Sequence, residues 1–211
     1  MDDPSDGQLL DAWTGGDARA FEALVDRHQS ALLRYSGALL GSGRGAEDAV
    51  QEVLLRLMEK PPDVLPSARG DAEKERAVLR AWLFTTTKRI CMDATRSQTR
   101  RSHREEAVAP REATKYDVDA VEGADTRAAV EASLERLPEK QREALTLRLF
   151  GELSYKDIGL VMDEKIGTVG WLISVGMKAL QRELAPLIGM EPADADGTRL
   201  TPAKSLQGGL S

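Results

Sequence analysis

The sequence predicts an all-helical protein built from two small helical domains. Of its 211 residues, 30% are charged and only 4% are aromatic, and alanine, leucine, glutamate and arginine are abundant. This composition is typical of helical proteins. Apolar residues recur at spacings of three and four, the period of one helix face, and strand-like runs are few. An acidic stretch poor in apolar residues separates two such periodic regions, and a chain of this length has room for two small domains.

The first helices are expected to be separated by short glycine-rich breaks. The first break is 15–17, and its last residue, Asp17, is a good N-cap for the helix that follows. The second break is 41–45. It precedes a helix over 46–58 whose early acidic residues suit the positive end of the helix dipole. The Pro-Pro pair at 61–62 ends that helix.

A loop and a long helix complete the first periodic region. Residues 61–75 contain proline, glycine and serine and are expected to form a loop. The helix that follows runs from about Glu75 to Arg101, and its apolar side carries Val78, Trp82, Leu83, Ile90 and Ala94. Trp82 is expected in the core because it shares a face with Val78 and Ile90. Cys91 is expected to be a small core residue.

The sign of the charge then reverses along the chain. Basic residues prevail between 88 and 104, and acidic residues prevail between 105 and 125. Because the acidic stretch has little apolar content, we expect a flexible linker there. The predicted division is a helical domain over 1–104, the acidic linker over 105–126, a second domain over 127–188 and a disordered tail over 189–211.

Residues 153–180 have the pattern of a helix-turn-helix. Ser154, followed three residues later by Asp157, resembles a capping box and starts the first helix. Asp163 is tolerated in the turn because a short polar side chain accepts unusual backbone angles, and Thr168 can cap the second helix. The inward stripe of that helix is Val169, Ile173, Gly176, Met177, Leu180 and Leu184.

The outer face of the second helix is poor in positive charge. In such a motif the second helix enters the major groove, where donors for phosphates and base edges are needed. Here Lys178 is the first cation of that face. Trp171, Leu172 and Val175 would form an exposed apolar patch, and such patches usually mark a contact surface.

Three explanations of this face stay open. The helix could read DNA through apolar contacts to thymine methyl groups, while Lys165, Thr168, Lys178 and Arg182 hold the backbone. The patch could be a docking site for another domain, the C-terminal tail or a second protein. Alternatively, the assumed helix register is wrong by a turn and these residues lie in the core.

Several classes of protein are disfavoured. The single cysteine rules out an intramolecular disulfide and fits a reducing cytoplasm. The acidic start of the chain lacks the apolar core of a signal peptide, and no apolar run approaches the length of a membrane span, so we expect no membrane insertion. No nucleophile–base pair or cofactor motif is present, and His28 and His103 lack clustered ligand partners. We therefore expect no enzyme, no metal and no cofactor.

Two ordered sets of motifs carry a family resemblance. The first set is Gly16-Asp-Ala-Arg-Ala-Phe21, Ala46-Glu-Asp-Ala-Val-Gln-Glu-Val53, Trp82-Leu-Phe-Thr85 and Asp93-Ala-Thr-Arg96. The second set is Leu137-Pro-Glu-Lys-Gln-Arg142, Leu153-Ser-Tyr-Lys-Asp-Ile158 and Gly167-Thr-Val169. In this order and separation they resemble the extracytoplasmic-function (group IV) sigma factors of the sigma-70 family, over about residues 6–188.

The resemblance implies a protein of transcription initiation. In that family a region 2-like domain binds the clamp helices of core RNA polymerase and melts and reads the minus-ten promoter element. A region 4-like helix-turn-helix domain binds the polymerase flap and reads the minus-thirty-five element. The linker passes through the catalytic cleft of the polymerase. No enzyme active site belongs to such a protein, and it acts in the cytoplasm.

The resemblance also implies contact residues. Those facing the polymerase clamp helices would be Asp48, Gln51, Glu52 and Arg56. Those on DNA at and upstream of the minus-ten element would be Lys88, Arg89, Arg96, Arg100 and Arg101. Those at the minus-thirty-five element would be Lys165, Thr168, Gly170, Trp171, Ser174 and Lys178. The loop 61–75 would lie near a flipped minus-ten base.

The chain departs from the family after the Gly-Thr-Val motif, where relatives usually carry several outward lysines or arginines. Two rival functions therefore stay open. A sigma mimic would bind an anti-sigma factor, or another protein such as an activator, through the apolar helix without initiating transcription. A plain helix-turn-helix repressor would use only residues 127–188 and would leave 17–104 unexplained.

Overall fold

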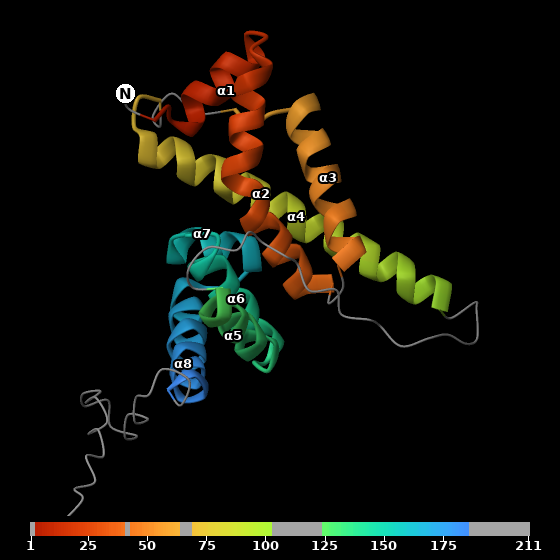
Figure 1. Cartoon of the computed structure of the whole chain (residues 1–211), viewed down its shortest axis with the longest axis vertical. Helices are drawn as coiled ribbons and strands as arrows, with labels where there is room; N and C mark the ends of the chain where they lie inside the picture. The colour runs from red at the N-terminus through yellow and green to blue at the C-terminus, as the bar shows by residue number, and fades with distance from the viewer. Residues whose placement is uncertain (1–2, 41–42, 64–68, 103–123, 186–211) are drawn as a thin grey trace, which may run out of the picture.

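All regular secondary structure in the part of the chain that the structure describes is helical. The structure, a computed structural model, describes residues 3–40, 43–63, 69–102 and 124–185. The helices shown in Figure 1 are α1 (Asp6–Thr14), α2 (Ala18–Leu40), α3 (Gly43–Glu59), α4 (Ala72–Ser102), α5 (Ala124–Glu135), α6 (Glu139–Leu149), α7 (Tyr155–Met162) and α8 (Ile166–Leu184). No strand occurs within these ranges, so the predicted all-α class is confirmed.

Helices α1–α4, the N-terminal group, pack around α2 and α4. The predicted break between the first two helices is confirmed. Gly16 has a φ of +100°, a conformation that glycine adopts freely. Asp17 Oδ1 accepts a hydrogen bond of 3.0 Å from the Arg19 amide at the start of α2, which is the predicted capping role.

The starts of α3 and α4 differ from the prediction, because both helices begin earlier in the chain. At α4, Asp71 Oδ1 accepts a hydrogen bond of 3.2 Å from the Lys74 amide. This cap starts the helix at Ala72 and shortens the predicted loop 61–75. Ala94 was also placed wrongly, since it is exposed. The buried side of α4 is carried by Leu79, Leu83, Phe84, Thr87 and Cys91, and no described side chain of α4 after Cys91 is buried.

The expected core positions of Cys91 and Trp82 are confirmed. Cys91 is buried, and burial raises the pKa of its thiol to about 11, so the thiol stays protonated and unreactive near neutral pH. Trp82 is partly buried and packs against the core.

A buried polar cluster fixes α1 on α2. The Asp6 side chain is fully buried, pairs with Arg27 and lies 3.0 Å from His28 Nε2. Burial alone would raise the pKa of Asp6, but the hydrogen bonds and charges of His28 and Arg27 outweigh burial and lower it. His28 thus has a structural partner on the neighbouring helix.

Helices α5–α8 form the C-terminal group, with α8 packed on α5, α6 and α7. Val169, Ile173, Gly176 and Leu180 of the predicted inward stripe are buried. A Cβ atom at Gly176 would lie 2.8 Å from Leu145 Cδ1. The absence of a side chain at that position therefore allows α6 and α8 to approach each other closely.

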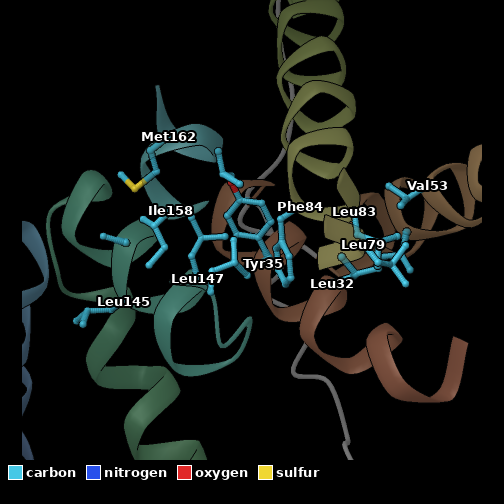
Figure 2. Packing of buried hydrophobic residues seen from close by; sticks show 14 of the residues in the cluster. Leu32, Tyr35, Val53, Leu79, Leu83, Phe84, Leu145, Leu147, Ile158 and Met162 are labelled. Atoms are coloured by element: carbon cyan, nitrogen blue, oxygen red, sulfur yellow. The ribbon is translucent and has the colours of Figure 1, made fainter. Parts of the chain in front are cut away.

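The two groups also pack against each other, mainly through α4 on α7 and α2 on α6. Tyr35 and Phe84 form an edge-to-face ring pair with centroids 5.3 Å apart. Figure 2 shows this pair between Leu32, Leu79 and Leu83 on one side and Leu147 and Ile158 on the other. The sequence predicted two domains on a linker but no contact between them.

Candidate nucleic-acid interface

The second half of α4 carries an exposed basic face. Arg89, Arg96 and Arg100 are all exposed and lie about one to three helical turns apart on one side of the helix. The Arg96–Asp93 pair is loose, at 3.5 Å, and solvent-exposed, so it holds Arg96 only weakly. Arg101 belongs to α4, but its side chain lies outside the described part of the structure. A row of cations of this kind can follow a phosphate backbone.

Lys88 does not join this face. It lies about 100° around the helix from Arg89 and turns toward the C-terminal group. Its Nζ is 2.9 Å from Glu143 Oε1, and its side chain is only 19% exposed. Glu143 Oε1 also accepts a hydrogen bond of 2.8 Å from the Tyr35 hydroxyl. In this arrangement the Lys88 ammonium is already paired with the Glu143 carboxylate.

The helix-turn-helix has the predicted turn. Ser154 Oγ accepts a hydrogen bond of 3.2 Å from the Asp157 amide. Only half of the capping box is present, because the Asp157 carboxylate accepts from the Ser154 hydroxyl (2.5 Å). Asp163 takes the left-handed conformation, with φ 57° and ψ 47°. A Cβ atom at Gly159 would lie 2.8 Å from the Glu164 carbonyl oxygen, so the turn closes directly over this glycine.

Thr168 was wrongly predicted to cap the second helix. The helix α8 begins at Ile166, with Lys165 at the N-cap position and no side-chain capping bond. The turn is short because Asp163 reverses the chain in one left-handed step, and the Glu164 amide then bonds the Gly159 carbonyl (2.9 Å). Thr168 therefore lies inside the first turn and is half-buried.

The predicted apolar patch does not exist as proposed. Leu172 is buried and Val175 is half-buried, while Trp171 is 59% exposed. Leu172 follows Val169 by three residues and precedes Gly176 by four, so it belongs to the inward stripe. Leu172 therefore lies in the core, but the helix register was not wrong, because Val169, Ile173 and the rest of the predicted stripe face inward. Of the three residues only Trp171 stands fully outside.

The exposed apolar surface of α8 lies instead in its first two turns. Ile166, which the sequence reasoning missed, is 56% exposed and precedes the exposed Gly167. Gly170 is half-buried beside Tyr155, since a Cβ atom there would lie 3.8 Å from the ring. The remaining predicted minus-thirty-five contacts are exposed: Lys165, Trp171, Ser174 and Lys178.

The outer face of α3 holds the predicted polymerase contacts. Asp48, Gln51 and Arg56 are exposed and Glu52 is half-buried, with Arg56 Nε 2.9 Å from Glu52 Oε1. Two exposed apolar side chains of α3, Leu55 and Met58, were missed. The sequence offered a signal for them, because both residues lie at helical spacings from the charged positions and so share their outer face. A solvent-facing surface that mixes apolar and charged side chains is suited to protein contact.

The end of the loop before α4 is anchored by Glu75. This buried carboxylate accepts hydrogen bonds from the Ser5 hydroxyl (2.5 Å) and the Gly70 amide (2.8 Å). These bonds lower the pKa of Glu75, and the bond from Ser5 has the largest effect. Residues 64–68 of the loop lie outside the described residues.

Neither a metal-binding cluster nor a membrane-spanning helix is found among the described residues. No group of three or more histidine, cysteine, aspartate or glutamate side chains among those residues could hold a metal ion. None of the helices described there combines the length and apolar character needed to cross a lipid bilayer.

Family models match both helical groups. The model of sigma-70 region 2 matches residues 24–101, and the model of sigma-70 region 4 matches residues 127–180. Together the two matches cover more than half of the chain, in the order that the motifs predicted.

Named relatives match most of the chain. It is 29% identical to the RNA polymerase sigma-H factor of Pseudomonas aeruginosa, over 87% of this chain and 95% of the relative. It is 29% identical to the ECF RNA polymerase sigma factor SigL of Mycobacterium tuberculosis, over 81% and 92%. It is 28% identical to the ECF RNA polymerase sigma-E factor of Escherichia coli, over 87% and 96%.

Two solved structures share the fold. The sigma factor RpoE in complex with the anti-sigma factor NepR, from Bartonella quintana, has a TM-score of 0.59 at 22% identity, over 79% of this chain and 98% of that chain. CnrH in complex with the cytosolic domain of CnrY has a TM-score of 0.53 at 20% identity, over 87% and 99%. With both family regions present in order and full-length relatives of one kind, the chain belongs to the sigma-70 family, among its extracytoplasmic-function sigma factors.

Proposed function

We propose that this protein is an alternative sigma factor that binds core RNA polymerase and directs it to promoter DNA. The observation that carries the proposal is the presence of region 2 and region 4 in one chain, each with an exposed surface suited to its task. The proposed domains are 1–104 and 127–188, joined by the acidic linker 105–126 and followed by the tail 189–211. Catalysis belongs to the polymerase, and the site of action is the cytoplasm.

The first domain would provide polymerase binding and minus-ten recognition. We assign the polymerase clamp helices to the outer face of α3, including Leu55 and Met58 beside the charged residues. We assign promoter DNA to the arginine face of α4, because three exposed cations on one side of a helix can neutralise phosphates of a nucleic-acid backbone. Lys88 would become available to DNA only after it leaves Glu143.

The second domain would bind the polymerase flap and read the minus-thirty-five element through the start of α8. Lys165 and Lys178 would hold phosphates, while Ile166 and Trp171 would contact base edges. Apolar side chains in the major groove favour the methyl group of thymine. We therefore propose an element in which thymine methyls, rather than hydrogen-bond donors and acceptors, carry much of the recognition.

An anti-sigma factor is a candidate partner, because both similar solved structures are complexes of a protein of this fold with a second protein. A sigma mimic that only binds such a partner is the second candidate function. The exposed Trp171 favours it, since indole rings are common anchors of protein interfaces. The burial of Leu172 reduces the apolar surface on which that reading depended.

The test is binding to core polymerase and run-off transcription with the full chain. We expect the wild-type chain to bind core polymerase and to initiate from a subset of a promoter library. Leu55→Glu should abolish both, because it places a charge on the proposed contact face. Gln29→Glu, which adds the same charge at an exposed position on α2, should abolish neither. A wild-type chain that bound no core polymerase and produced no transcript would remove the proposal.

A further inference from the structure

The outer face of α8 combines exposed apolar side chains with glycines that the fold does not require. Trp171 is 59% exposed and Ile166 is 56% exposed. Between them, a Cβ atom at Gly167 would meet open space, and one at Gly170 would make only an ordinary contact of 3.8 Å with the Tyr155 ring. Glycine weakens a helix relative to alanine. Two such glycines beside exposed apolar residues therefore favour a close approach by another segment of chain.

A basic segment continues this face toward the end of α8. Lys178 and Arg182 are exposed, and they lie about two and three turns after Trp171 on the same side of the helix. Glu183, the acid next to Arg182, pairs with Arg136 (3.4 Å). From its C-terminal end, the outer face of α8 thus presents positive charge first and apolar surface second.

The sequence after α8 has the complementary order. Residues 186–211 lie outside the described residues. In their sequence the acids Glu191, Asp194 and Asp196 come before Leu200, and no cation precedes Arg199. The chain that leaves α8 therefore offers negative charge first and a leucine afterwards, in the order in which the helix offers cations and then apolar surface.

Chain length decides which of these residues can reach Trp171. Trp171 lies 14 positions before Ala185, or about 21 Å along the helix. An extended chain spans at most about 3.3–3.6 Å per residue, so Met190 can cover only about 18 Å and falls short of the indole. Leu200 can cover about 50 Å and reaches it. The acids between them reach the basic segment, which lies closer to the end of the helix.

We propose that residues 191–200, the acidic segment, dock on the outer face of α8. The acids pair with Lys178 and Arg182, and Leu200 lies beside Trp171. Because the acidic segment is attached to the end of the same helix, its effective concentration there is about millimolar, and a weak contact is enough. The acidic segment competes with the phosphates and bases of an upstream promoter element. This competition rests on the proposed function, whereas the docking itself does not.

Docking is tested on the full chain, without polymerase or DNA, by the quenching of a bimane label by tryptophan. The label is attached at Thr201→Cys, next to Leu200, and an indole in contact with it quenches its fluorescence. The buried Cys91, with its thiol pKa raised to about 11, does not compete for the label. We expect strong quenching in the otherwise unaltered chain and its loss in Trp171→Phe. Trp13→Phe, which removes a half-buried indole of the N-terminal group, should leave the quenching unchanged.

Charge reversal tests the acidic residues separately. Replacing Lys178 and Arg182 by glutamate should lower the docked fraction about two- to fivefold, because two exposed ion pairs become repulsive. Replacing Asp194 and Asp196 by lysine should have the same effect, and the two double changes together should restore the quenching.

The control for charge reversal is Arg19→Glu with Lys60→Glu, the same change at exposed positions of the N-terminal group. It should leave the quenching as it is in the parent chain.

Competition with DNA is measured with a double-stranded oligonucleotide that carries the upstream sequence enriched in a promoter selection. Leu200→Ser, which leaves the net charge unchanged, should raise the affinity of the free chain for this duplex about threefold. Leu210→Ser makes the same change later in the sequence and should leave the affinity unchanged. Equal affinities of the two variants would overturn the competition.

Three results would overturn the docking. One is an unquenched label in the parent chain, and another is quenching that survives in Trp171→Phe. The third is quenching that disappears on dilution, since a second copy of the chain would then be the occupant. A failure to transcribe from any promoter would remove the proposed function instead, and the quenching experiment on the free chain would still decide whether the acidic segment docks.

Discussion

The two helices proposed to contact DNA, α4 and α8, present opposite chemistries. The end of α4 exposes a row of arginines, whereas the start of α8 exposes Ile166 and Trp171, with Lys165 before them and Lys178 two turns later. Cations on phosphates supply affinity that is strongly salt-dependent and largely independent of sequence. Contacts to base edges supply sequence dependence. Under the proposed function, α4 would supply most of the affinity and α8 would supply the upstream specificity.

Both surfaces are exposed in the described part of the structure, although another side of α4 is covered. The side of α4 that carries Lys88 and Arg80 is covered by the C-terminal group. The start of α8 is open, with Trp171 mostly in solvent. The arginine face itself is exposed, as is the start of α8, so the covered cations belong to another side of α4.

The largest expected effect comes from removing the arginine face. Replacing Arg89, Arg96 and Arg100 together by alanine should lower the affinity of the polymerase complex for promoter DNA on the order of 100-fold. The salt slope of binding should fall by about 2 to 3, because that many phosphate contacts are lost. Fluorescence anisotropy across a range of salt concentrations measures both quantities.

The control for this change removes exposed cations elsewhere on the N-terminal group, at Arg19 and Lys60. It should leave the salt slope within the error of the parent protein. A triple variant with an unchanged salt slope would show that α4 does not supply the phosphate contacts. The assignment of salt-dependent affinity to α4 would then be wrong.

The next effect concerns the fold that supports α4. Asp6→Asn should lower the free energy of unfolding by about 3 kcal/mol, because it leaves the buried His28 without its carboxylate and the half-buried Arg27 with only the exposed Asp3 as a carboxylate partner. Folding lowers the pKa of Asp6 and Glu75 below their usual 3.8 and 4.5. Their contributions are therefore present above those values and are lost as the pH falls below them.

Urea unfolding at pH 7 and at decreasing pH measures this effect. The wild type should lose stability below about pH 4, and Asp6→Asn should lose less, because one of the two carboxylates is already gone. An equal acid loss in both proteins would place the acid-sensitive groups elsewhere in the chain.

A smaller effect is expected from Trp171→Ala. Loss of one exposed apolar contact should lower binding to a promoter with its preferred upstream element roughly tenfold, without changing the salt slope. The matched control is Leu160→Ala, another exposed apolar side chain, on α7. A changed salt slope in Trp171→Ala would contradict the separation of roles between the two helices.

The smallest effect is expected at Gly167, in the first turn of α8. A Cβ atom there meets open space, so Gly167→Ala should raise the free energy of unfolding by about 0.5 kcal/mol through helix propensity. The melting temperature should rise by roughly 1–2 °C in a chain of this size. A lower melting temperature would show that α8 does not begin where it is described.

Local signals in the sequence predicted most of the elements, because each element is marked within a few residues. Asp17 caps α2, Asp163 forms the turn before α8, and the exposed arginines of α4 follow from helical spacing. The errors at Thr168 and Leu172 have different causes. The predicted N-cap, Thr168, lies three residues after the actual N-cap, Lys165. Leu172 lies beside the predicted inward stripe, and the buried side of α8 is wider than that stripe.

The contact between the two helical groups could not be predicted in the same way. Tyr35 and Glu143 are 108 positions apart in sequence, and no local pattern links them. Tyr35 fits the apolar side of α2 whether or not another domain covers it. From the sequence alone Lys88 and Arg80 would be placed on the exposed side of a long helix, and only the three-dimensional arrangement shows which acids cover them.

The measurement that tests the central claim most directly is transcription from a promoter library with a fixed minus-ten element and a randomised upstream region. Wild-type protein and Trp171→Ala are compared with the same core polymerase. Our account predicts that the wild type enriches thymine-containing upstream sequences, and that Trp171→Ala still initiates but loses this enrichment. The same upstream sequences enriched by both proteins would contradict the assignment of specificity to the apolar start of α8.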